Sequence, residues 1–448
     1  MALSELQYAG QFEIEELKLF SSTGIFISLE QLAMEVDIYE DIFSNAITGH
    51  LFMIDTDNLI SNFPIIGQET LSLKFKTPNF EEDETQLNFT DEHKFHVYKI
   101  GLSTEISHGS NVYKLDFTTP EILQNLRVRV SKSYTRSISE IVSDLLKNTK
   151  YIGTTKKIHM EPTRGTRKYV CPNHHPYKII KNLLKESISM ETSSPHYLFF
   201  ENARGLHFRT LQDLYTEPGK GTYHSGDYIR TGVGTEIGSE QNTRLDMTRI
   251  LSHEIITNND MMLNILGGVL GSKNITHDIY NKNYEIDEFN YFADFDKHDR
   301  ISVGESDITD NPRYSQGEDE YSGKDIGRFP DSDIHLIPQA PLSYSKEYTQ
   351  SQLRDCLLQR KSRILELHRG VQVNFNVHGH TALAAGDMVK LELPVRGNDH
   401  EEDKISKYYK GRFLITRIRH QFSTSLATPT HLMHIAAFRD SLPESLPV

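Results

Sequence analysis

Cysteine and histidine are the residues of this chain most suited to metal chemistry, and one short run combines them. Cys171, His174 and His175 lie together in the run VCPNHHP, and both residue types bind zinc. A zinc site needs further ligands at matching spacing, and Cys356, the second cysteine of the chain, is remote in sequence. Because Pro176 follows at once, we interpret the run as a polar strand-to-helix junction that begins a helix.

Other potential metal ligands stand two residues apart in three places. These pairs are His378 and His380, Asp55 and Asp57, and Asp331 and Asp333. The histidine pair follows an expected strand and fits a turn, and neither aspartate pair has the spacing of a calcium loop with its later glutamate. We therefore interpret all three as turns.

Sequence motifs of enzymes are also missing. The glycine-rich stretches 232–238 and 267–268 lack the Lys-Ser/Thr of a phosphate-binding loop, and no GxSxG run occurs. With 62 acidic residues, any choice of a catalytic carboxylate pair would be arbitrary. We predict no catalytic, cofactor-binding or metal-binding residue and no enzymatic activity.

The bulk composition limits the class of protein. A chain of 448 residues predicts two to four domains, and its two cysteines favour synthesis in a reducing cytoplasm. The net charge of −14 opposes tight binding of nucleic acid but suits a wall past which DNA slides. There is no long apolar run for a membrane span and no signal-peptide pattern at the N-terminus.

A β unit that occurs twice is the strongest architectural signal. Residues 95–102 and 112–117 read as a hairpin, preceded by the alternating strand TLSLKFK at 70–76. FLITRI at 413–418 corresponds to FHVYKI at 95–100, and HLMHIA at 431–436 corresponds to YKLDFT at 113–118, with one constant offset in sequence number. DMVKLEL at 387–393 repeats the alternating strand. We therefore predict that both hairpins lie in equivalent places.

The remaining texture predicts a mainly β chain of the α+β class. Helices are expected at 137–148, where Ser137 and Glu140 form a capping box, at 176–189, at 259–270 and at 345–361. Residues 365–377 alternate and predict a strand, or two strands meeting at Gly370. We expect a first β-barrel domain at 1–118, an α+β insertion domain at 119–243, a strand–helix–strand segment at 244–292 that belongs to the second barrel, an acidic loop-rich excursion at 293–345, and a second β-barrel domain at 346–448.

Three segments resemble the baseplate central hub proteins of contractile-tailed bacteriophages. Residues 36–75 resemble the first tube domain of that family, 170–211 its insertion domain, and 363–438 its second tube domain. The last segment also resembles late-control-D tail proteins and type VI secretion spike proteins. Within the first segment the matching motif positions are Gly49, Leu51, Asp55, Gly67, Glu69, Leu71 and Leu73.

The resemblance implies a homotrimer whose six tube domains form a pseudo-sixfold ring. Such a ring joins the tail-tube protein ring to a trimeric spike protein and leaves a channel for DNA, in a baseplate made in the bacterial cytoplasm. The excursion at 293–345 would contact wedge or tape-measure proteins or decorate the surface. The alternatives are a hub or spike component of a type VI-like injection machine and a tail-associated cell-wall hydrolase. For the ring, we expect polar replacement of Ile100 or Ile418 to weaken assembly.

Overall fold

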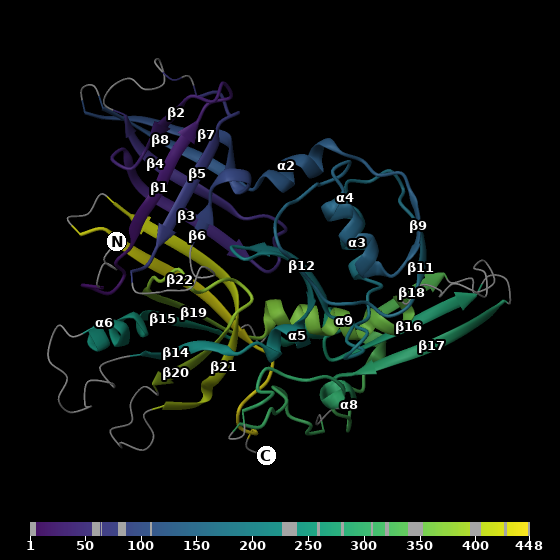
Figure 1. Ribbon diagram of the computed structural model, residues 1–448. Coiled ribbons are helices and arrows are strands. Elements are labelled where there is room, and N and C mark those ends of the chain that lie inside the picture. Colours follow the sequence, from purple (N-terminus) through teal and green to yellow (C-terminus); the bar gives the residue numbers. More distant parts are fainter. Residues whose placement is uncertain are drawn as a thin grey trace.

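The structure is a computed structural model, mainly β, with helical parts between and beside its sheets (Figure 1). None of the helices it describes is long and apolar enough to cross a membrane. It describes residues 6–55, 63, 65–78, 87–107, 110–225, 240–257, 260–278, 282–305, 308–318, 322–338, 353–394, 405–424 and 428–446. Asp57 and the glycine-rich stretch 232–238 therefore lie outside the described residues.

The first β unit is a curled antiparallel sheet around its own core. Its strands pair in the order β2-β1-β5-β7-β8-β4-β3, with β6 beside β5. The strand predicted at 70–76 is present, and its alternating residues Leu71, Leu73 and Phe75 are fully buried and form its inward face. The strands are β1 (Glu13–Phe20), β2 (Phe26–Ser28), β3 (Ala33–Asp41), β4 (Thr48–Asp55), β5 (Thr70–Lys76), β6 (Leu87–Phe89), β7 (Phe95–Ser107) and β8 (Ser110–Thr118).

The second β unit is a closed six-stranded barrel. The order is β21-β20-β14-β15-β19-β22, and pairing of β22 with β21 closes it. β14 runs parallel to both neighbours, and the other pairs are antiparallel. The strands are β14 (Gly219–Ser225), β15 (Arg249–Thr257), β19 (Val371–His378), β20 (Met388–Pro394), β21 (Ile405–Ser423) and β22 (Thr430–Arg439).

The two units share one strand order, so the predicted repeat extends beyond the hairpins. The first unit contains the antiparallel series β5-β7-β8-β4-β3, and the barrel contains β20-β21-β22-β19-β15, with the strands in the same spatial order. One offset needs correction. Val97 pairs with Phe117 in the first unit, and Ile415 pairs with Ala437 in the barrel. The offset in sequence number between β8 and β22 is therefore two residues larger than the offset between β7 and β21. A shift of two keeps each side chain on its face.

Two β-bulges recur at matching positions and support this equivalence. Tyr98 interrupts the pairing of β7 with β8, and Thr416, its counterpart by the predicted offset, interrupts that of β21 with β22. Met34 is skipped between β3 and β4, and Leu251 is skipped in the same way between β15 and β19. Because a bulge fixes register, Met34 corresponds to Leu251, and counting along both strands makes Thr257 the counterpart of Glu40.

An α+β part follows β8 and lies beside the first unit (Figure 1). The capping box at Ser137 and Glu140 is present and begins α3. Apolar faces of α3 and α4 pack with the β12–β13 hairpin in a separate core. The elements are α2 (Pro120–Arg127), β9 (Ser133–Arg136), α3 (Ile138–Lys147), β10 (Ile158–Met160), β11 (Arg167–Val170), α4 (Pro176–Leu184), β12 (Tyr197–Asn202), β13 (Gly205–Thr210) and α5 (Leu211–Thr216).

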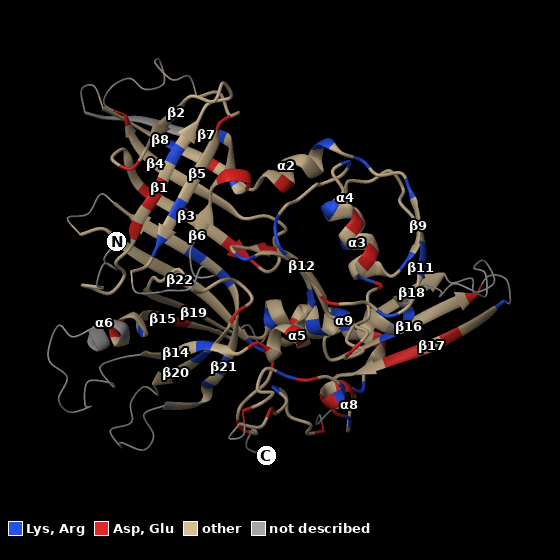
Figure 2. Ribbon diagram, in the orientation of Figure 1, with Lys and Arg blue, Asp and Glu red and all other residues tan. Residues whose placement is uncertain are grey.

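A three-stranded sheet, β17-β16-β18, projects as an arm, and β17 itself carries acidic residues (Figures 1 and 2). Long helix α9 packs against it and continues through residues 365–369, so the strand predicted there is wrong. Leu367 is buried on the helix, which explains the misleading apolar pattern. The elements are α6 (Glu240–Met247), α7 (Met261–Leu266), β16 (Gly271–Asp278), β17 (Asn283–Asn290), α8 (Tyr291–Asp294), β18 (Ile334–Pro338) and α9 (Leu353–Arg369), with short 3-10 turns at η2 (Asp91–His93), η4 (Phe295–Lys297) and η5 (Pro330–Ser332).

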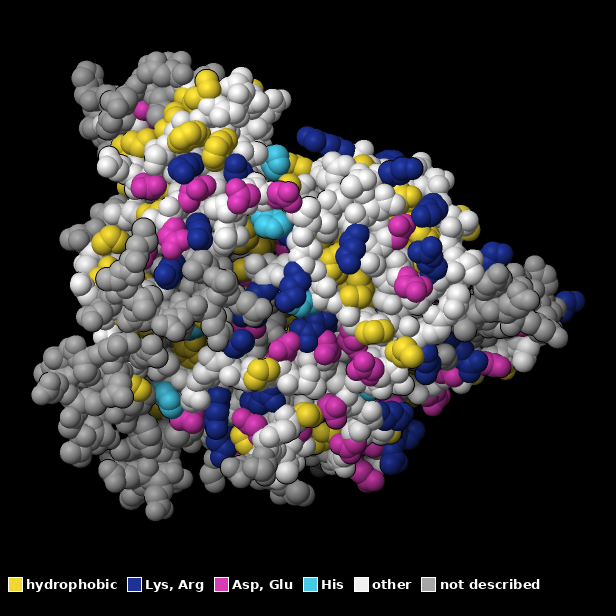
Figure 3. Space-filling model, viewed as in Figure 1, with side chains coloured by type: hydrophobic (Ala, Val, Ile, Leu, Met, Phe, Trp, Pro, Cys, Tyr) yellow, Lys and Arg dark blue, Asp and Glu magenta, His cyan; other side chains and the backbone are white. Residues whose placement is uncertain are grey.

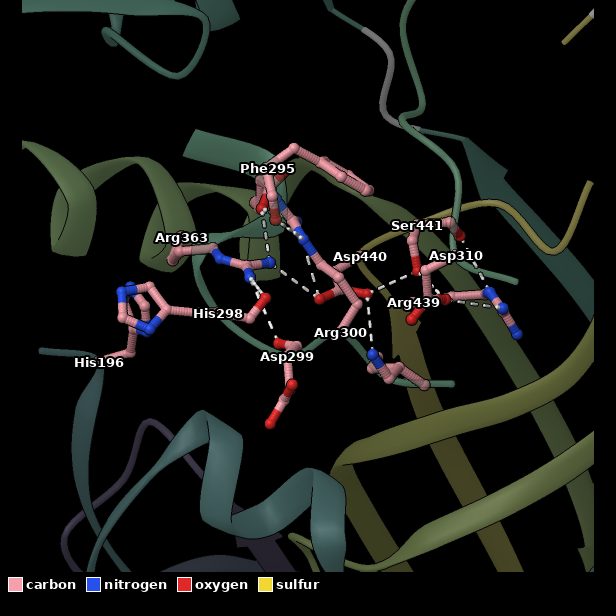
Figure 4. Close-up of polar contacts among 12 residues, drawn as sticks. His196, Phe295, His298, Asp299, Arg300, Asp310, Arg363, Arg439, Asp440 and Ser441 are labelled. Carbon is pink, nitrogen blue, oxygen red and sulfur yellow. Dashed lines mark hydrogen bonds and ion pairs between the residues drawn. The ribbon is translucent and has the colours of Figure 1, made fainter. Parts of the chain in front are cut away.

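Buried ion pairs attach the segment after α8 to the barrel (Figure 4). Arg300 lies 3.2 Å from Glu366 of α9, and Arg363 of the same helix lies 2.9 Å from Asp440, just after β22. Arg439 contacts Asp310 at 3.5 Å. Three arginines therefore face three carboxylates, and their charges balance. The acidic stretch predicted as an excursion is thus anchored here by its basic as well as its acidic residues.

Asp440→Ala should destabilise the fold strongly, because it leaves Arg363 buried without its closest carboxylate. We expect the free energy of unfolding to fall by about 3–5 kcal/mol in urea denaturation followed by circular dichroism. Asp331→Ala is the matched control, since that carboxylate pairs with Lys273 at an exposed position, and we expect a change below about 1 kcal/mol. Equal losses in the two variants would contradict a structural role for the buried cluster.

Candidate assembly interface

The zinc-like run forms the strand-to-helix junction that the sequence predicts. Cys171 is buried, and burial raises the pKa of its thiol to about 11. The backbone carbonyl of His174 accepts a hydrogen bond from Val130, and Nδ1 of His175 lies 2.9 Å from the carbonyl oxygen of Val128. Pro176 is the first residue of α4. These contacts place the run at the junction between β11 and α4.

The members of the spaced ligand pairs have separate partners in the structure. His378 ends β19, and the ring of His380 lies 2.9 Å from the hydroxyl of Tyr223 inside the barrel. Asp55 ends β4 and is buried. Asp331 pairs with Lys273, whereas Asp333 pairs with His335 and Lys361. Within the described ranges, the structure therefore does not bring these residues together.

Among the described residues, the structure brings together one set of three potential metal ligands that sequence reasoning missed. Potential ligand atoms of Glu35, Asp37 and His50 lie within 4.8 Å of one another. Both oxygens of Asp37 accept hydrogen bonds from Arg419 of β21, each at 2.9 Å, and His50 lies 2.6 Å from the same carboxylate. Burial alone would raise the pKa of Asp37, but the hydrogen bonds from His50 and Arg419 hold it below its usual value. We therefore interpret the cluster as an ion pair that joins the two β units.

These residues mark the junction of β3 with β21. β21 pairs with β20 up to Leu414, passes the Thr416 bulge, and then pairs with β3 from Arg417 to Ser423. The backbone N–H of Ile42 continues the ladder by donating to the carbonyl of Thr416 at 3.0 Å. A groove of about 640 Å³ lies across the junction, lined by residues of β3, β15, β19, β21 and β22. The sheet of the first unit thus continues into the barrel.

Glu40 holds three parts of the chain at this junction. Its side chain is buried on β3, and its two carboxyl oxygens accept backbone N–H groups from Ala203 and Ala385, each at 2.8 Å. Ala203 lies in the β12–β13 turn and Ala385 precedes β20. Burial raises the pKa of Glu40 to about 7. In the next residue of the turn, Arg204 donates to both oxygens of Asp387.

The strand corresponding to β21 in the first unit has a free edge. β7 pairs with β5 only at Phe95 and His96, and among the described residues no strand lies along that edge further on. Ile100 is 36% exposed, whereas its counterpart Ile418 is 1% exposed in the barrel core. The sequence predicts the same effect on assembly for polar replacement of either isoleucine. Only a replacement of Ile100 can test assembly, because a polar replacement of Ile418 would destabilise the barrel itself.

The strand corresponding to β3 in the barrel has a free edge too. β15 pairs with β14 only at Arg249 and Ile250, and in the described parts of the chain its edge has no strand beyond Ile250. In β3 the matching edge, from Glu35 onward, is the one that pairs with β21. Each unit therefore has two such edges. The β3 edge of the first unit and the β21 edge of the barrel pair with each other within the chain, whereas the β7 edge and the β15 edge remain open.

The fold is similar to that of two solved tail proteins. No family model and no curated protein sequence matches the chain. Its structure is similar to that of the tail protein from Neisseria meningitidis MC58, with TM-score 0.51 and 9% identity over 96% of this chain and 97% of that one. It is also similar to the 43 kDa tail protein of prophage MuSo2 from Shewanella oneidensis, with TM-score 0.50 and 10% identity over 96% and 99%. At such identities the likeness shows a shared fold, and the prediction of a tail-protein architecture is confirmed at that level.

Glu40→Gln should destabilise the protein in a pH-dependent way. Near pH 5 the buried Glu40 is protonated, and its hydroxyl oxygen can still accept an N–H group, whereas the amide nitrogen of glutamine cannot, so we expect a loss of about 1–3 kcal/mol at that pH. Because folding raises the pKa of Glu40, its stabilising contribution is present at low pH and is lost as the pH rises through about 7. The difference between variant and wild type should therefore shrink near pH 8.5, about 1.5 units above that pKa.

Urea denaturation at both pH values would check this expectation. Glu30→Gln, at an exposed position, serves as the control and should match the wild type at both. A difference between wild type and Glu40→Gln that stays constant or grows with pH would contradict the raised pKa.

Proposed function

We propose that this chain is the structural hub of a phage tail baseplate, acting as a homotrimer whose six β units form a pseudo-sixfold ring. The observation that carries the proposal is the matched pair of edges. Within the chain, the first unit gives its β3 edge to β21 of the second. The second unit has a β15 edge that corresponds to β3, and the first has a β7 edge that corresponds to β21.

Pairing β15 of one copy with β7 of the next would repeat the internal junction between chains. The register follows from the equivalences: Ile418 lies opposite Glu40, so Ile100 would lie opposite Thr257 of the neighbouring copy. Such a contact is head-to-tail and leaves free edges until the ring closes. Three chains supply six similar units, which is what a threefold protein needs to match a sixfold tube.

The likeness to phage tail proteins supports a place in the tail for this ring. We propose that one end seats on the tail-tube protein ring and the other on a trimeric spike protein, with DNA passing through the lumen. The charge of the chain suits this role, because a net charge of −14 repels phosphate groups. Two arginines at the junction of β3 with β21 are paired with carboxylates, which reduces their attraction for phosphate. Arg417 pairs with Asp41 at 3.0 Å, and Arg419 pairs with Asp37.

We propose further that the chain has no enzymatic activity of its own. The purified protein should give no clearing in a zymogram on peptidoglycan or capsule. Reproducible clearing that an Asp or Glu substitution abolishes would establish a tail-associated hydrolase instead.

Ile100→Glu should weaken trimer formation while leaving the fold intact. The side chain is exposed in the single chain but would be buried at the β7–β15 contact, where a carboxylate loses its hydration. Light scattering coupled to size exclusion should give a trimer for the wild type and smaller species for the variant, with matching circular dichroism spectra. Ile25→Glu, at an exposed position before β2, is the control and should remain trimeric. A wild-type monomer at every concentration would contradict the ring.

A further inference from the structure

Helix α7 has its polarity reversed relative to an ordinary surface helix. Its apolar side chains are exposed, with Met262 at 75% and Leu266 at 67%, while its one polar residue, Asn264, is fully buried. The side-chain amide of Asn264 donates to the hydroxyl of Tyr314 at 2.9 Å. A surface helix normally turns its apolar side inward, so this helix presents a face suited to covering by another surface.

The helix is held in that orientation by contacts on its inner side. Asp260 caps it by accepting the N–H of Leu263, and Arg369 of α9 donates to the carbonyl of Leu263. Gly267 packs against the same arginine, where a Cβ would meet the guanidinium at 2.6 Å. The apolar face is therefore directed outward by packing on α9.

A second apolar patch lies on the first unit, beside the free edge of β7. It consists of Ile66, Tyr98 and Ile100, which are 63%, 50% and 36% exposed. Ile66 precedes Gly67, whose backbone approaches the carbonyl of Tyr98, so the turn at 66–67 lies beside β7. Figure 3 shows hydrophobic side chains gathered over this unit, around β1, β2 and β7. We call these three residues the β7 patch.

The internal junction shows what covers such a patch. The barrel counterparts of Tyr98 and Ile100 are Thr416 and Ile418, and Ala385 stands before β20 much as Ile66 stands before β5. All three counterparts are buried. Glu40 binds the N–H of Ala385, and Ile42, just after β3, hydrogen-bonds to Thr416. Ile418 is buried by the barrel core itself, whereas the chain that leaves β3 lies against the other two counterparts, Thr416 and Ala385.

We propose that α7 of one copy packs on the β7 patch of the next copy. This rests on the proposed ring, and it deepens it by assigning α7 as the apolar contact of the interface. α7 begins four residues after Thr257, the position placed opposite Ile100, so it can start no more than about 14 Å from that residue. In the repeat, α7 takes the place of the segment after β3, where Ile42 and Phe43 pack against the barrel.

Cross-linking between chains tests this placement. Met262→Cys and Ile66→Cys would be made in separate chains, mixed, and treated with a short bismaleimide. Both native cysteines are buried, so they should not compete. We expect a covalent dimer in the mixture only, and a ladder up to trimer when both cysteines are in one chain. Met262→Cys mixed with Met190→Cys is the control, because Met190 is exposed on the α+β part, and it should not cross-link.

Each result distinguishes α7 from the ring as a whole. A protein that is trimeric by light scattering but gives no link between positions 262 and 66 would overturn the α7 contact and leave the ring standing. A monomer in light scattering would overturn both. A link within one chain, or a link from position 262 only to an added spike protein, would also overturn the contact between copies.

A polar variant gives a second readout that does not depend on a cross-linker. Met262→Ser and Leu266→Ser alter exposed positions, so the single chain should fold as the wild type does. Each should raise the dissociation constant of the trimer by about tenfold, because a large apolar side chain is no longer buried on assembly. Unchanged dissociation constants for both variants would overturn the proposal.

Discussion

The backbone groups along a strand edge need hydrogen-bonding partners, and this requirement organises the protein. Along one edge of β21, the first half pairs with β20 and the second half pairs with β3. β22 pairs along the other edge. The Thr416 bulge separates the two partners and turns the strand from one to the other. Through this strand the curled sheet and the closed barrel become one hydrogen-bonded surface, and the same requirement leaves β7 and β15 incomplete in a single chain.

Buried polar groups then fix how the remaining parts sit on this surface. Glu40 reaches the insertion part and the barrel at once, and Arg204 with Asp387 supports the same contact. A second contact joins α9 to the end of β22 through the ion pair of Arg363 with Asp440. An unpaired buried charge is costly, so such groups penalise any arrangement in which the parts are displaced.

Sequence reasoning found the elements whose signals are local. The alternating strand at 70–76, the two hairpins and the capping box at Ser137 follow from period and turn chemistry, and the structure confirms them. It was wrong at 365–369, where a helix face imitated strand alternation, and in the offset of β22, where the equivalence shifts by two positions within the hairpin. The Asp37–His50–Arg419 cluster was invisible because β3 and β21 lie near opposite ends of the sequence. Their pairing is decided by register, which one sequence does not display.

The two β units differ most in one connection. β3 passes to β4 through six residues, whereas the corresponding step from β15 to β19 spans residues 258–370 and contains α7, the arm and α9. The extra elements in the β15–β19 connection of the barrel, which the β3–β4 connection of the first unit lacks, therefore form an insertion that occurs once per chain. In the proposed ring, the shared β unit would therefore occur six times, whereas the inserted elements α7, the arm and α9 would occur three times. One molecule would then offer a sixfold surface to one neighbour and a threefold surface to another, and so convert between two symmetries without any change in its own fold.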